Sequence, residues 1–562
     1  MRITDTSDLW WKNAILYSLD VETFYDADGD GVGDIQGLAR RIDYLADLGI
    51  TCLWLMPFYP SPDRDDGYDV MDYYGVDERL GNHGQFVELV RLAHDRGIRV
   101  IADLVINHTS DQHPWFKASR KEKDPEKNYY RDFYVWRPDD PGDTSDQVVF
   151  PDEEDSIWTL DERTGEYYLH HFYSHQPDLN LDHPPVVDEI MRTVGFWLQL
   201  GLDGFRVDGV PFFEQSAEAT GSPEYVVDPH RFMKQLRDFL SRRNGSAMML
   251  GEVNLSREEQ LRFFGGESAD EMHMQFDFIT MQRTYLALAR QDARPLVEAL
   301  HGRPPIHRTC QWATFLRNHD ELTLDKLTEE ERQEVFAAFG PEERMQVYDR
   351  GLKRRLPPMM GGDPRRVRMA YSLMFSLPGT PALYFGEEIG MGEDLEAEGR
   401  MAVRSPMQWS PGKNGGFSTA RPSQLVQRVV PGPYGPEHVN VLTQQHDPDS
   451  LLSWIRGLID IRKACPEVGW GELTVLEHDA GPQVLAHRLD IDASAVLAVH
   501  NLGAEPVTVE VTVDGPIPDP HLTDLLSHET LAVEKGGVLP VQLDGYGVRW
   551  VRLRPQGQLS IP

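Results

Sequence analysis

Four short segments of the chain place polar residues directly after aliphatic runs. They are DLVINH at 103–108, GFRVD at 204–208, GEVN at 251–254 and FLRNHDE at 315–321. Each run is typical of a buried strand, and each polar group stands where that strand would end. In a parallel (β/α)8 barrel the carboxyl ends of all strands open onto one mouth, so side chains distant in sequence can meet there. The pattern predicts an α/β fold of the (β/α)8 TIM barrel type with a site at its mouth.

Asp208 and Glu252 form the carboxylate pair of this expected site. Retaining cleavage of a glycosidic bond uses one carboxylate as nucleophile and a second carboxyl as acid and then base, about 5–5.5 Å apart. Arg206, two residues before Asp208, lies on the same face of the strand and would hold that carboxylate ionised. Glu252 must begin protonated, which a poorly solvated position would favour. Any one of these residues alone is explained as well by a helix cap or a solvated loop, so the prediction depends on their joint occurrence.

With two further motifs, QPDLN at 176–180 and GTPALYFGEEIGM at 379–391, the chain resembles the α-amylase superfamily, glycoside hydrolase family 13, over nearly its whole length. The resemblance implies that Asp208 is the nucleophile and Glu252 the general acid/base. Asp320 would be the third carboxylate, which binds sugar hydroxyls and favours the distorted transition state. The supporting substrate-binding residues would be His108, Arg206 and His319.

Composition limits the partners of the chain. Its 91 acidic and 55 basic residues give a formal net charge of −36, which would repel nucleic acid and an anionic membrane. Three cysteines, Cys52, Cys310 and Cys465, suggest reduced thiols rather than a disulfide framework. The first residues lack the pattern of a secretion signal, and no apolar run is long enough to span a bilayer. We therefore expect a cytoplasmic enzyme for a small α-glucoside, with assembly into a homo-oligomer left open.

The hydrophobic pattern divides the chain into three parts. Residues 1–108 and 183–466 would form the catalytic barrel, with its first strands at 15–19, 52–56 and 100–105 and helices at 35–48 and 84–96. Residues 109–182 are polar, aromatic and too long for an ordinary loop, which predicts an inserted domain B after the third strand. Short alternating runs in 467–562 predict a C-terminal antiparallel β domain, a β-sandwich.

The segment DADGDGVGD at 26–34 presents aspartates at alternating positions followed by glycine. A hard cation needs several oxygen ligands on a tightly turned backbone, although an acidic surface turn would look the same. A complete EF-hand is excluded, because its twelfth position is Gly37. The resemblance implies one structural Ca²⁺ held by Asp26, Asp28, Asp30, the Val32 carbonyl and Asp34. It also implies a weaker second site at Asn107, Asp178 and Glu214.

The segment RDDGYD at 64–69 bears on substrate size. Tyr68 could stack on a sugar ring while Asp65 binds the hydroxyls at its closed end, which would block a long polysaccharide. Ordinary packing at the barrel mouth is the alternative explanation for Tyr68. In exo-acting and disaccharide-acting relatives a similar pair defines a pocket for one glucose, and the resemblance adds Arg404 of VRSPMQW to that pocket.

Within the family the chain is most similar to the trehalose synthases and the oligosaccharide α-glucosidases. The likeness depends on RDDGYD, SHQPDLNLD at 174–182, NHDELTL at 318–324 and a charged insertion at 328–366. It implies isomerisation of maltose and trehalose, which requires the released glucose to stay beside the glucosyl-enzyme while water is excluded. The insertion could be the lid, or only a solvated pair of helices. The alternatives are an α-glucosidase with the same catalytic residues and, more distantly, a non-catalytic sugar-binding relative, which would lack a carboxylate.

Three segments depart from the common pattern of that branch. Gly209-Val210-Pro211-Phe212-Phe213 replaces the usual Ala-Val-Pro-Tyr-Leu, and Arg400-Met401-Ala402-Val403 replaces Arg-Asp-Gly-Val. The segment YSLDVETF at 17–24 is also atypical. These departures leave the three carboxylates in place. They concern the recognition of the acceptor sugar and the closure of the lid over the site.

Overall fold

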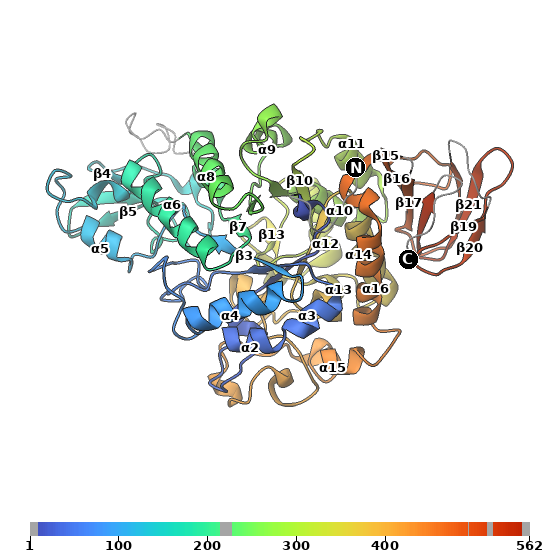
Figure 1. Cartoon of the computed structure of the whole chain (residues 1–562), viewed down its shortest axis with the longest axis horizontal. Helices are drawn as coiled ribbons and strands as arrows, with labels where there is room; N and C mark the ends of the chain where they lie inside the picture. Colours follow the sequence, from blue (N-terminus) through green and yellow to red (C-terminus); the bar gives the residue numbers. More distant parts are fainter. Residues whose placement is uncertain (1–8, 214–227, 493, 514–520, 554–562) are drawn as a thin grey trace.

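The computed structural model describes residues 9–213, 228–492, 494–513 and 521–553. Eight parallel strands close into a barrel in the order β1-β14-β10-β9-β8-β7-β3-β2 at the centre of the molecule (Figure 1). The predicted (β/α)8 fold is confirmed. The barrel strands are β1 Leu16–Leu19, β2 Cys52–Leu55, β3 Arg99–Leu104, β7 Gly204–Val207, β8 Met248–Gly251, β9 Met274–Phe276, β10 Gln311–Thr314 and β14 Thr380–Tyr384.

The register of the barrel brings the predicted site residues to one edge. Arg206 of β7 pairs with Asp103 of β3 on one side, and Val207 pairs with Gly251 of β8 on the other. Asp208 and Glu252 are the next residues of β7 and β8, so they emerge side by side where the two strands end. All residues of β7 and β8 are buried, as expected for parallel strands covered on both faces.

Helices cover the outside of the barrel. The predicted helix at 35–48 is wrong in one respect, because it is broken at Arg41 into two helices. The guanidinium carbon of Arg41 lies 4.0 Å from the ring centroid of Tyr25 and 4.3 Å from that of Trp409. These contacts with two aromatic faces stabilise the break. The main covering helices are α2 Ile35–Arg40, α3 Ile42–Leu48, α4 His83–His94, α6 Pro184–Gln199, α8 Pro229–Arg243, α9 Arg257–Phe263, α10 Phe278–Arg290, α11 Arg294–His301, α14 Pro364–Ser376 and α16 Leu451–Ala464.

An inserted domain stands between β3 and β7, on the left in Figure 1. It contains helix α5, Pro114–Ser119, and an antiparallel sheet in the order β4-β6-β5, formed by Trp136–Arg137, Glu166–Leu169 and Trp158–Asp161. A β-bridge between His108 and Asp178 ties the end of the insertion to the end of β3. The insertion therefore begins and ends at the barrel mouth.

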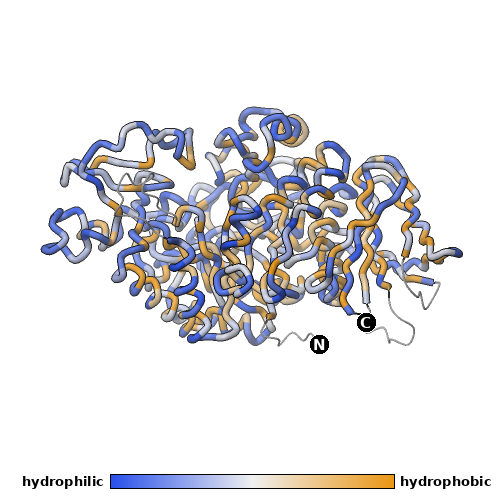
Figure 2. Tube along the Cα trace, turned by 90° about the horizontal axis from the view of Figure 1, so that it is seen from above, coloured by the Kyte–Doolittle hydropathy of each residue, from blue (hydrophilic) through white to orange (hydrophobic). Residues whose placement is uncertain are grey.

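The last part of the chain is an antiparallel β domain, as predicted, at the right of Figure 1. Its main sheet has the order β15-β16-β17-β22, and a smaller one pairs β18 with β21. Apolar stretches alternate with polar ones along these strands in Figure 2, and valines and leucines from both sheets form a shared buried cluster. The strands are β15 Glu472–Val475, β16 Val484–Ile491, β17 Ser494–Asn501, β18 Val507–Thr512, β19 His521–Thr523, β20 Thr530–Ala532, β21 Val538–Leu543 and β22 Val548–Leu553.

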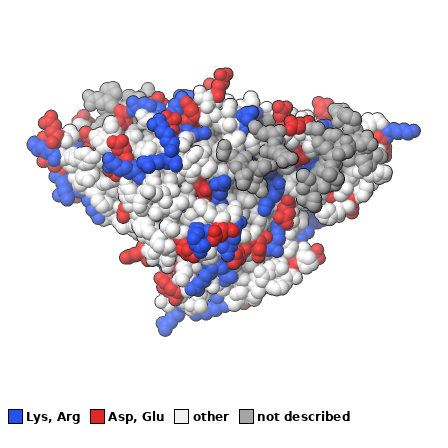
Figure 3. All heavy atoms as spheres, in the orientation of Figure 1, with Lys and Arg blue, Asp and Glu red and all other residues white. Residues whose placement is uncertain are grey.

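The surface carries mixed charge. On the face drawn in Figure 3, basic and acidic side chains are interspersed, which is typical of a solvated surface. Among the helices that the structure describes, none has the length and apolar character needed to cross a membrane.

The β domain is joined to barrel helix α14 through two buried histidines. His487 Nε2 donates to the Ser376 carbonyl at 3.0 Å, and His500 Nε2 lies 2.9 Å from Ser372 Oγ, which also accepts from Trp550 Nε1. The two imidazole rings are parallel, with centroids 5.8 Å apart. Burial lowers the pKa of His487 to about 4 and that of His500 well below its ordinary value. Both histidines are therefore neutral at neutral pH.

This pair predicts a loss of stability in mild acid. Unfolded His487 takes up a proton as the pH falls below 6.5, but folded His487 does so only near pH 4, so acid favours unfolding in that window. The shift in pKa between the unfolded and the folded state corresponds to a loss of the order of 3 kcal/mol in the free energy of unfolding for one such histidine. The free energy of unfolding, measured in denaturant from about pH 7 to about pH 4.5, should therefore fall less steeply in His487→Gln than in the wild type. Replacing the exposed His438 by Gln is the control, and an equal effect of both variants would contradict the assignment.

Candidate active site

One guanidinium, that of Arg206, contacts three carboxylates at the barrel mouth. Its Nη1 donates to Asp208 Oδ1 at 2.5 Å and to Asp103, and its Nη2 lies 2.7 Å from Glu252 Oε2. Only 1% of the Arg206 side chain is exposed. Because water screens such a buried charge poorly, Arg206 couples the predicted nucleophile to the predicted acid/base.

The ionisation of the pair suits two different roles. Burial raises the pKa of Asp208 to about 6 and that of Glu252 to about 7, although the Arg206 charge opposes both shifts. The charges of Asp103 and Asp320 raise the pKa of Asp208 further, and those of Asp208 and Asp320 raise the pKa of Glu252, so the two groups titrate together. Glu252 Oε2 also accepts the Gly209 N–H at 3.1 Å, and 23% of the Glu252 side chain remains exposed. Near neutral pH Glu252 holds a proton more often than Asp208, as an acid beside a nucleophile must.

The third carboxylate, Asp320, follows β10 and is held by two arginines. Asp320 Oδ1 lies 2.7 Å from Arg400 Nη1 and 3.2 Å from Arg404 Nη2, and its Oδ2 lies 3.1 Å from His319 Nε2. Burial opposes ionisation of Asp320, yet its basic neighbours hold the pKa well below the usual range. Burial also lowers the pKa of His319 to about 4, so His319 is neutral and the permanent positive charge comes from the arginines. Asp320 is therefore a stable anion.

Arg400 lies at the closed end of the pocket, although it was not predicted from the sequence as a site residue. Asp65 Oδ1 lies 2.6 Å from Arg400 Nη2, and Asp65 Oδ2 accepts from Gln176 Nε2 at 2.9 Å. Arg404 instead binds Asp66 and donates from Nε to the His319 carbonyl at 2.9 Å. The arginine beside Asp65 is thus Arg400. Arg400 belongs to the segment at 400–403 that departs from the family pattern, and this departure was visible in the sequence. The sequence does not distinguish which of two arginines four residues apart reaches Asp65.

Tyr68 and the two histidines complete this end of the pocket. The Tyr68 ring lies parallel to that of His319, with centroids 5.5 Å apart, and its hydroxyl is 2.7 Å from His319 Nε2. His108 Nε2 is 3.2 Å from the Tyr68 carbonyl. The Nδ1 atoms of both histidines are buried and have no hydrogen-bond partner within the described part of the chain. Burial keeps the pKa of each imidazole below its usual value, so both are neutral groups that can bind hydroxyls.

A cavity of about 440 Å³, within the range of small-molecule sites, lies beside Glu252 and Asp320. Glu252, Asp320 and Arg400 line one part of it, and aromatic rings line another. The rings of Phe172 and Phe212 pack edge to face with centroids 4.8 Å apart. Such a site offers charged groups for hydroxyls and apolar faces for sugar rings. The lining residues also include Phe150, Phe172, Pro211, Phe212, Asn254, Phe278, Glu321, Asp325 and Arg350.

The atypical Gly209 has a structural reason. Its φ is +55°, and a Cβ at this position would lie 3.2 Å from the Phe172 ring. Glycine therefore lets Phe172 approach the turn that carries the Glu252 hydrogen bond. This departure from the common pattern changes the shape of the cavity beside the acid/base.

The charged insertion at 328–366 reaches the cavity. Strand β13, Gly351–Leu352, pairs with β11, Leu322–Thr323, directly after the third carboxylate, and with β12, Gln346–Val347. At the hairpin tip, the Tyr348 ring lies 4.9 Å from that of Phe150 in the inserted domain. Arg350 Nη1 donates to the Val149 carbonyl at 2.7 Å, and its Nη2 lies 3.4 Å from Glu321 Oε1. The insertion, which also includes α12 Glu329–Phe339 and α13 Leu356–Met359, thus meets the inserted domain above the site.

The acidic loop at 26–34 brings a smaller set of ligands together than predicted. Asp26, Asp28 and Asp34 each have a carboxylate oxygen within 4.8 Å of the others. Asp30, whose Oδ1 accepts the Val32 N–H at 2.8 Å, is outside this group. Burial raises the pKa of Asp34, and the neighbouring Asp28 and Asp26 raise it further. Three clustered carboxylate oxygens on a turned backbone fit a calcium ion.

The predicted second metal site is only partly within the described residues. Asn107 Nδ2 donates to Asp178 Oδ1 at 3.1 Å, and Asp178 also pairs with His171. Asn107 Oδ1 is buried without a hydrogen-bond partner among the residues described. Glu214, the third predicted ligand, lies outside the described residues. This site stays a prediction.

Comparison with known proteins identifies the family. Residues 21–339 and 353–471 match the α-amylase catalytic domain, and residues 494–552 match a sucrose hydrolase-like C-terminal domain. The chain therefore belongs to the α-amylase family, as its motifs predicted. It is 40% identical to a trehalose synthase/amylase of Mycolicibacterium smegmatis, over 98% of this chain and 93% of that protein. It is 31% identical to an oligo-1,6-glucosidase of Parageobacillus thermoglucosidasius, over 84% of this chain and 86% of that protein.

A solved structure agrees with this placement. The trehalulose synthase of Pseudomonas mesoacidophila superposes with a TM-score of 0.75 at 27% identity, over 97% of this chain and 99% of that chain. The trehalose synthase of Pimelobacter is 39% identical over 97% of this chain and 96% of its own length. Both relatives are covered over nearly their whole length.

The contacts of Arg206 with three carboxylates lead to a prediction about stability. Arg206→Met would leave Asp103, Asp208 and Glu252 buried without their partner, which costs about 3–5 kcal/mol for a broken buried pair. Urea unfolding followed by circular dichroism measures this cost. The matched control is Arg242→Met, which removes an exposed arginine paired with Asp238 on α8. Equal stability of both variants would show that the three carboxylates do not depend on Arg206.

Proposed function

We propose that the protein isomerises maltose and trehalose by moving one glucosyl residue within a closed site. It is an enzyme of the α-amylase family whose relatives include trehalose synthases. The observation that carries the proposal is the hydrogen bond from Arg350 to the Val149 carbonyl, which joins the charged insertion to the inserted domain beside the cavity that Glu252 and Asp320 line. A covered site retains a released sugar and excludes water.

In the first half of the reaction, a terminal glucose lies on Tyr68 with its hydroxyls bound by Asp65 and Asp320. Asp208, the stronger acid of the coupled pair, attacks the anomeric carbon and forms a glucosyl ester. Glu252 gives its proton to the glycosidic oxygen as that bond breaks, so free glucose leaves as a neutral molecule. Arg206 stays bound to both carboxylates while their charges change places.

In the second half, the free glucose turns within the cavity and presents its own anomeric hydroxyl. Glu252, now ionised, takes the hydroxyl proton, and the oxygen attacks the glucosyl ester. The bond to Asp208 breaks, and the disaccharide linkage that forms joins two anomeric carbons. Water attacking the same ester would give hydrolysis, so the access of water decides the product.

Hydrolysis of short α-glucosides is the second candidate function, because an α-glucosidase would use the same three carboxylates. The likeness to the oligo-1,6-glucosidase supports it. Incubation with maltose or trehalose, followed by carbohydrate chromatography, separates the two. Interconversion with glucose as a minor product supports the isomerase; glucose alone at every time point would replace it by the glucosidase. No turnover of any α-glucoside would favour a non-catalytic sugar-binding protein.

The coupled pair predicts a narrow pH optimum. Activity should fall in acid as Asp208, with a pKa of about 6, is protonated, and in alkali as Glu252, with a pKa of about 7, loses its proton. The plot of kcat/KM against pH for an aryl α-glucoside should therefore be bell-shaped. With α-glucosyl fluoride, whose leaving group needs no acid, the alkaline limb of glucosyl-enzyme formation should be absent from both the wild type and Glu252→Gln. Retention of that limb would assign it to another group.

The lid contact predicts a change in product ratio. Arg350→Ala removes the bond to Val149, and weakening closure by about 1 kcal/mol would expose the ester to water roughly fivefold more often. Glucose release should rise relative to isomerisation by a similar factor. Arg344→Ala, in the same insertion but 56% exposed and distant from the cavity lining, is the control. A ratio that is unchanged in Arg350→Ala would contradict a closing role.

The loop at 26–34 would hold one structural Ca²⁺ through Asp26, Asp28 and Asp34, and bound calcium would stabilise the barrel rather than act in the reaction. At a calcium concentration 100 times Kd the gain is about 2.7 kcal/mol. Differential scanning calorimetry should show a higher Tm in calcium than in chelator, with a smaller difference in Asp28→Asn. A difference that Asp28→Asn leaves unchanged would place the stabilising ion elsewhere.

The remaining expectations concern surroundings and partners. A small α-glucoside is the substrate class that the relatives and the cavity support. Cytoplasmic location and the absence of nucleic-acid or membrane partners are inferred from the reduced cysteines and the acidic composition. Size-exclusion chromatography with light scattering would decide whether the chain forms a homo-oligomer.

A further inference from the structure

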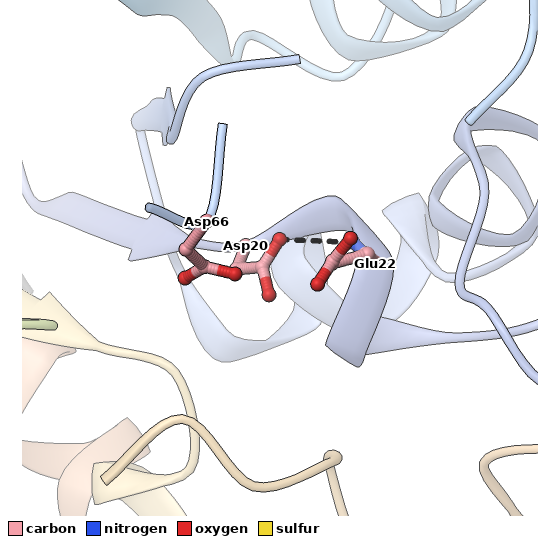
Figure 4. Close-up of side chains that lie close together, drawn as sticks. All are labelled: Asp20, Glu22 and Asp66. Carbon is pink, nitrogen blue, oxygen red and sulfur yellow. Dashed lines mark hydrogen bonds between the residues drawn. The ribbon is translucent and has the colours of Figure 1, made fainter. Parts of the chain in front are cut away.

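Three carboxylates meet below the sugar pocket, apart from the acidic loop already described. Asp20 follows β1 and caps helix α1, Val21–Phe24, which contains Glu22, while Asp66 lies in the RDDGYD segment. Each offers an oxygen within 4.8 Å of the other two, and Figure 4 shows the Asp20 carboxylate between those of Asp66 and Glu22. Asp20 and Glu22 are 4% and 5% exposed, and the Asp66 side chain is 3% exposed. Carboxylates buried this closely repel one another unless something neutralises them.

The arginines that touch this cluster are shared with other carboxylates. Arg79 Nη1 lies 3.2 Å from Glu22 Oε2, but Arg79 also pairs with Asp63 and Asp77. Arg404 pairs with Asp66 and also with Asp320. The cluster is therefore short of positive charge.

Among the residues that the structure describes, no cationic side chain contacts Asp20. Its two oxygens accept the Glu22 N–H at 2.9 Å and the Thr23 hydroxyl at 2.6 Å. Neutral donors of this kind satisfy the hydrogen-bonding capacity of a carboxylate without removing its charge. The charge of Asp20 is therefore opposed only through space, by arginines such as Arg404 that contact its neighbours.

Two hydroxyls beside the cluster have no partner. Ser18 of β1 and Tyr384 of β14 are neighbours in the barrel register, and Asp20 follows two residues after Ser18 on the same side of its strand. They are 2% and 1% exposed, and within the described chain neither hydroxyl oxygen has a hydrogen-bond partner. Buried hydroxyls left unpaired beside anions indicate a missing ligand.

We propose that Asp20, Glu22 and Asp66 bind a calcium ion, at a site distinct from the loop at 26–34. Calcium binds oxygen at 2.3–2.6 Å, so ligands on opposite sides of the ion lie about 4.6–5.2 Å apart, and the cluster is within that reach. Calcium also accepts irregular arrangements of about six to eight oxygen ligands, whereas magnesium demands near-ideal octahedral geometry at about 2.0–2.1 Å. The segment at 17–24 that departs from the family pattern supplies two of the three ligands.

The site is joined to the sugar pocket through one arginine. Asp66 binds Arg404, and Arg404 Nη2 lies 3.2 Å from Asp320 Oδ1. An ion that neutralises Asp66 would leave more of the Arg404 charge for Asp320. The ion therefore acts as a positioning element for the third carboxylate and does not touch the substrate.

Metal content of the purified full chain tests the site. The protein is stripped with chelator, dialysed against micromolar calcium and measured by inductively coupled plasma mass spectrometry. The double variant Asp20→Asn with Glu22→Gln keeps the helix cap and the side-chain shapes, and should lose one ion per chain relative to the wild type. Asp28→Asn, in the other loop, should leave that ion bound, and this holds whether or not the loop binds calcium itself. Equal calcium in the wild type and the double variant overturns the proposal.

Two further measurements keep the test decisive if the double variant folds poorly. Glu22→Lys places a cation within the cluster, so its Tm in chelator should equal or exceed that of the wild type in chelator. Anomalous diffraction from wild-type crystals grown in calcium should show an ion between the three carboxylates. Absence of the ion, with an infrared band of a protonated carboxyl that the double variant lacks, would show that the cluster is neutralised by protons and that the proposal is wrong.

Discussion

The charge of Arg206 is the interaction on which the barrel mouth depends. Three carboxylates in a poorly hydrated space would repel one another and take up protons, and a single guanidinium holds them together by contacting Asp103, Asp208 and Glu252. The register of β7 with its two neighbours fixes that guanidinium, because strand pairing sets where each side chain emerges. The same contact lowers the pKa of both the nucleophile and the acid/base, against the effect of burial.

The substrate end of the pocket repeats this design with two more arginines. Arg400 joins Asp65 to Asp320, and Arg404 joins Asp320 to Asp66. Charged groups that already form a closed network can bind hydroxyls without large rearrangement, since their positions are fixed before the sugar arrives. The neutral imidazoles of His108 and His319 add hydroxyl-binding atoms without adding charge. These groups form a polar surface at one end of the pocket, and the hairpin at 346–352 contacts the inserted domain.

Sequence predicted the parts of this site that depend on local order. Asp208 and Glu252 follow their strands directly, so the strand pattern places them, and the strand ends fell within a residue of the predicted ones. Contacts set by long loops were not predictable in the same way. Arg400 rather than Arg404 reaches Asp65 because of the path of a loop more than three hundred residues away along the chain. The break at Arg41 depends likewise on Trp409, which is distant in sequence, and the acidic cluster at Asp20 was visible only as an atypical segment.

The central claim is that Asp208 carries the glucosyl group while Glu252 supplies the proton. Intact-protein mass spectrometry of the Glu252→Gln variant, quenched during turnover of α-glucosyl fluoride, tests this most directly. The fluoride needs no acid to leave, and the missing base slows the attack of water, so the ester should accumulate. The account predicts one glucosyl group per chain, located by peptide mapping on Asp208. Fluoride release without any adduct, or an adduct on another residue, would contradict it.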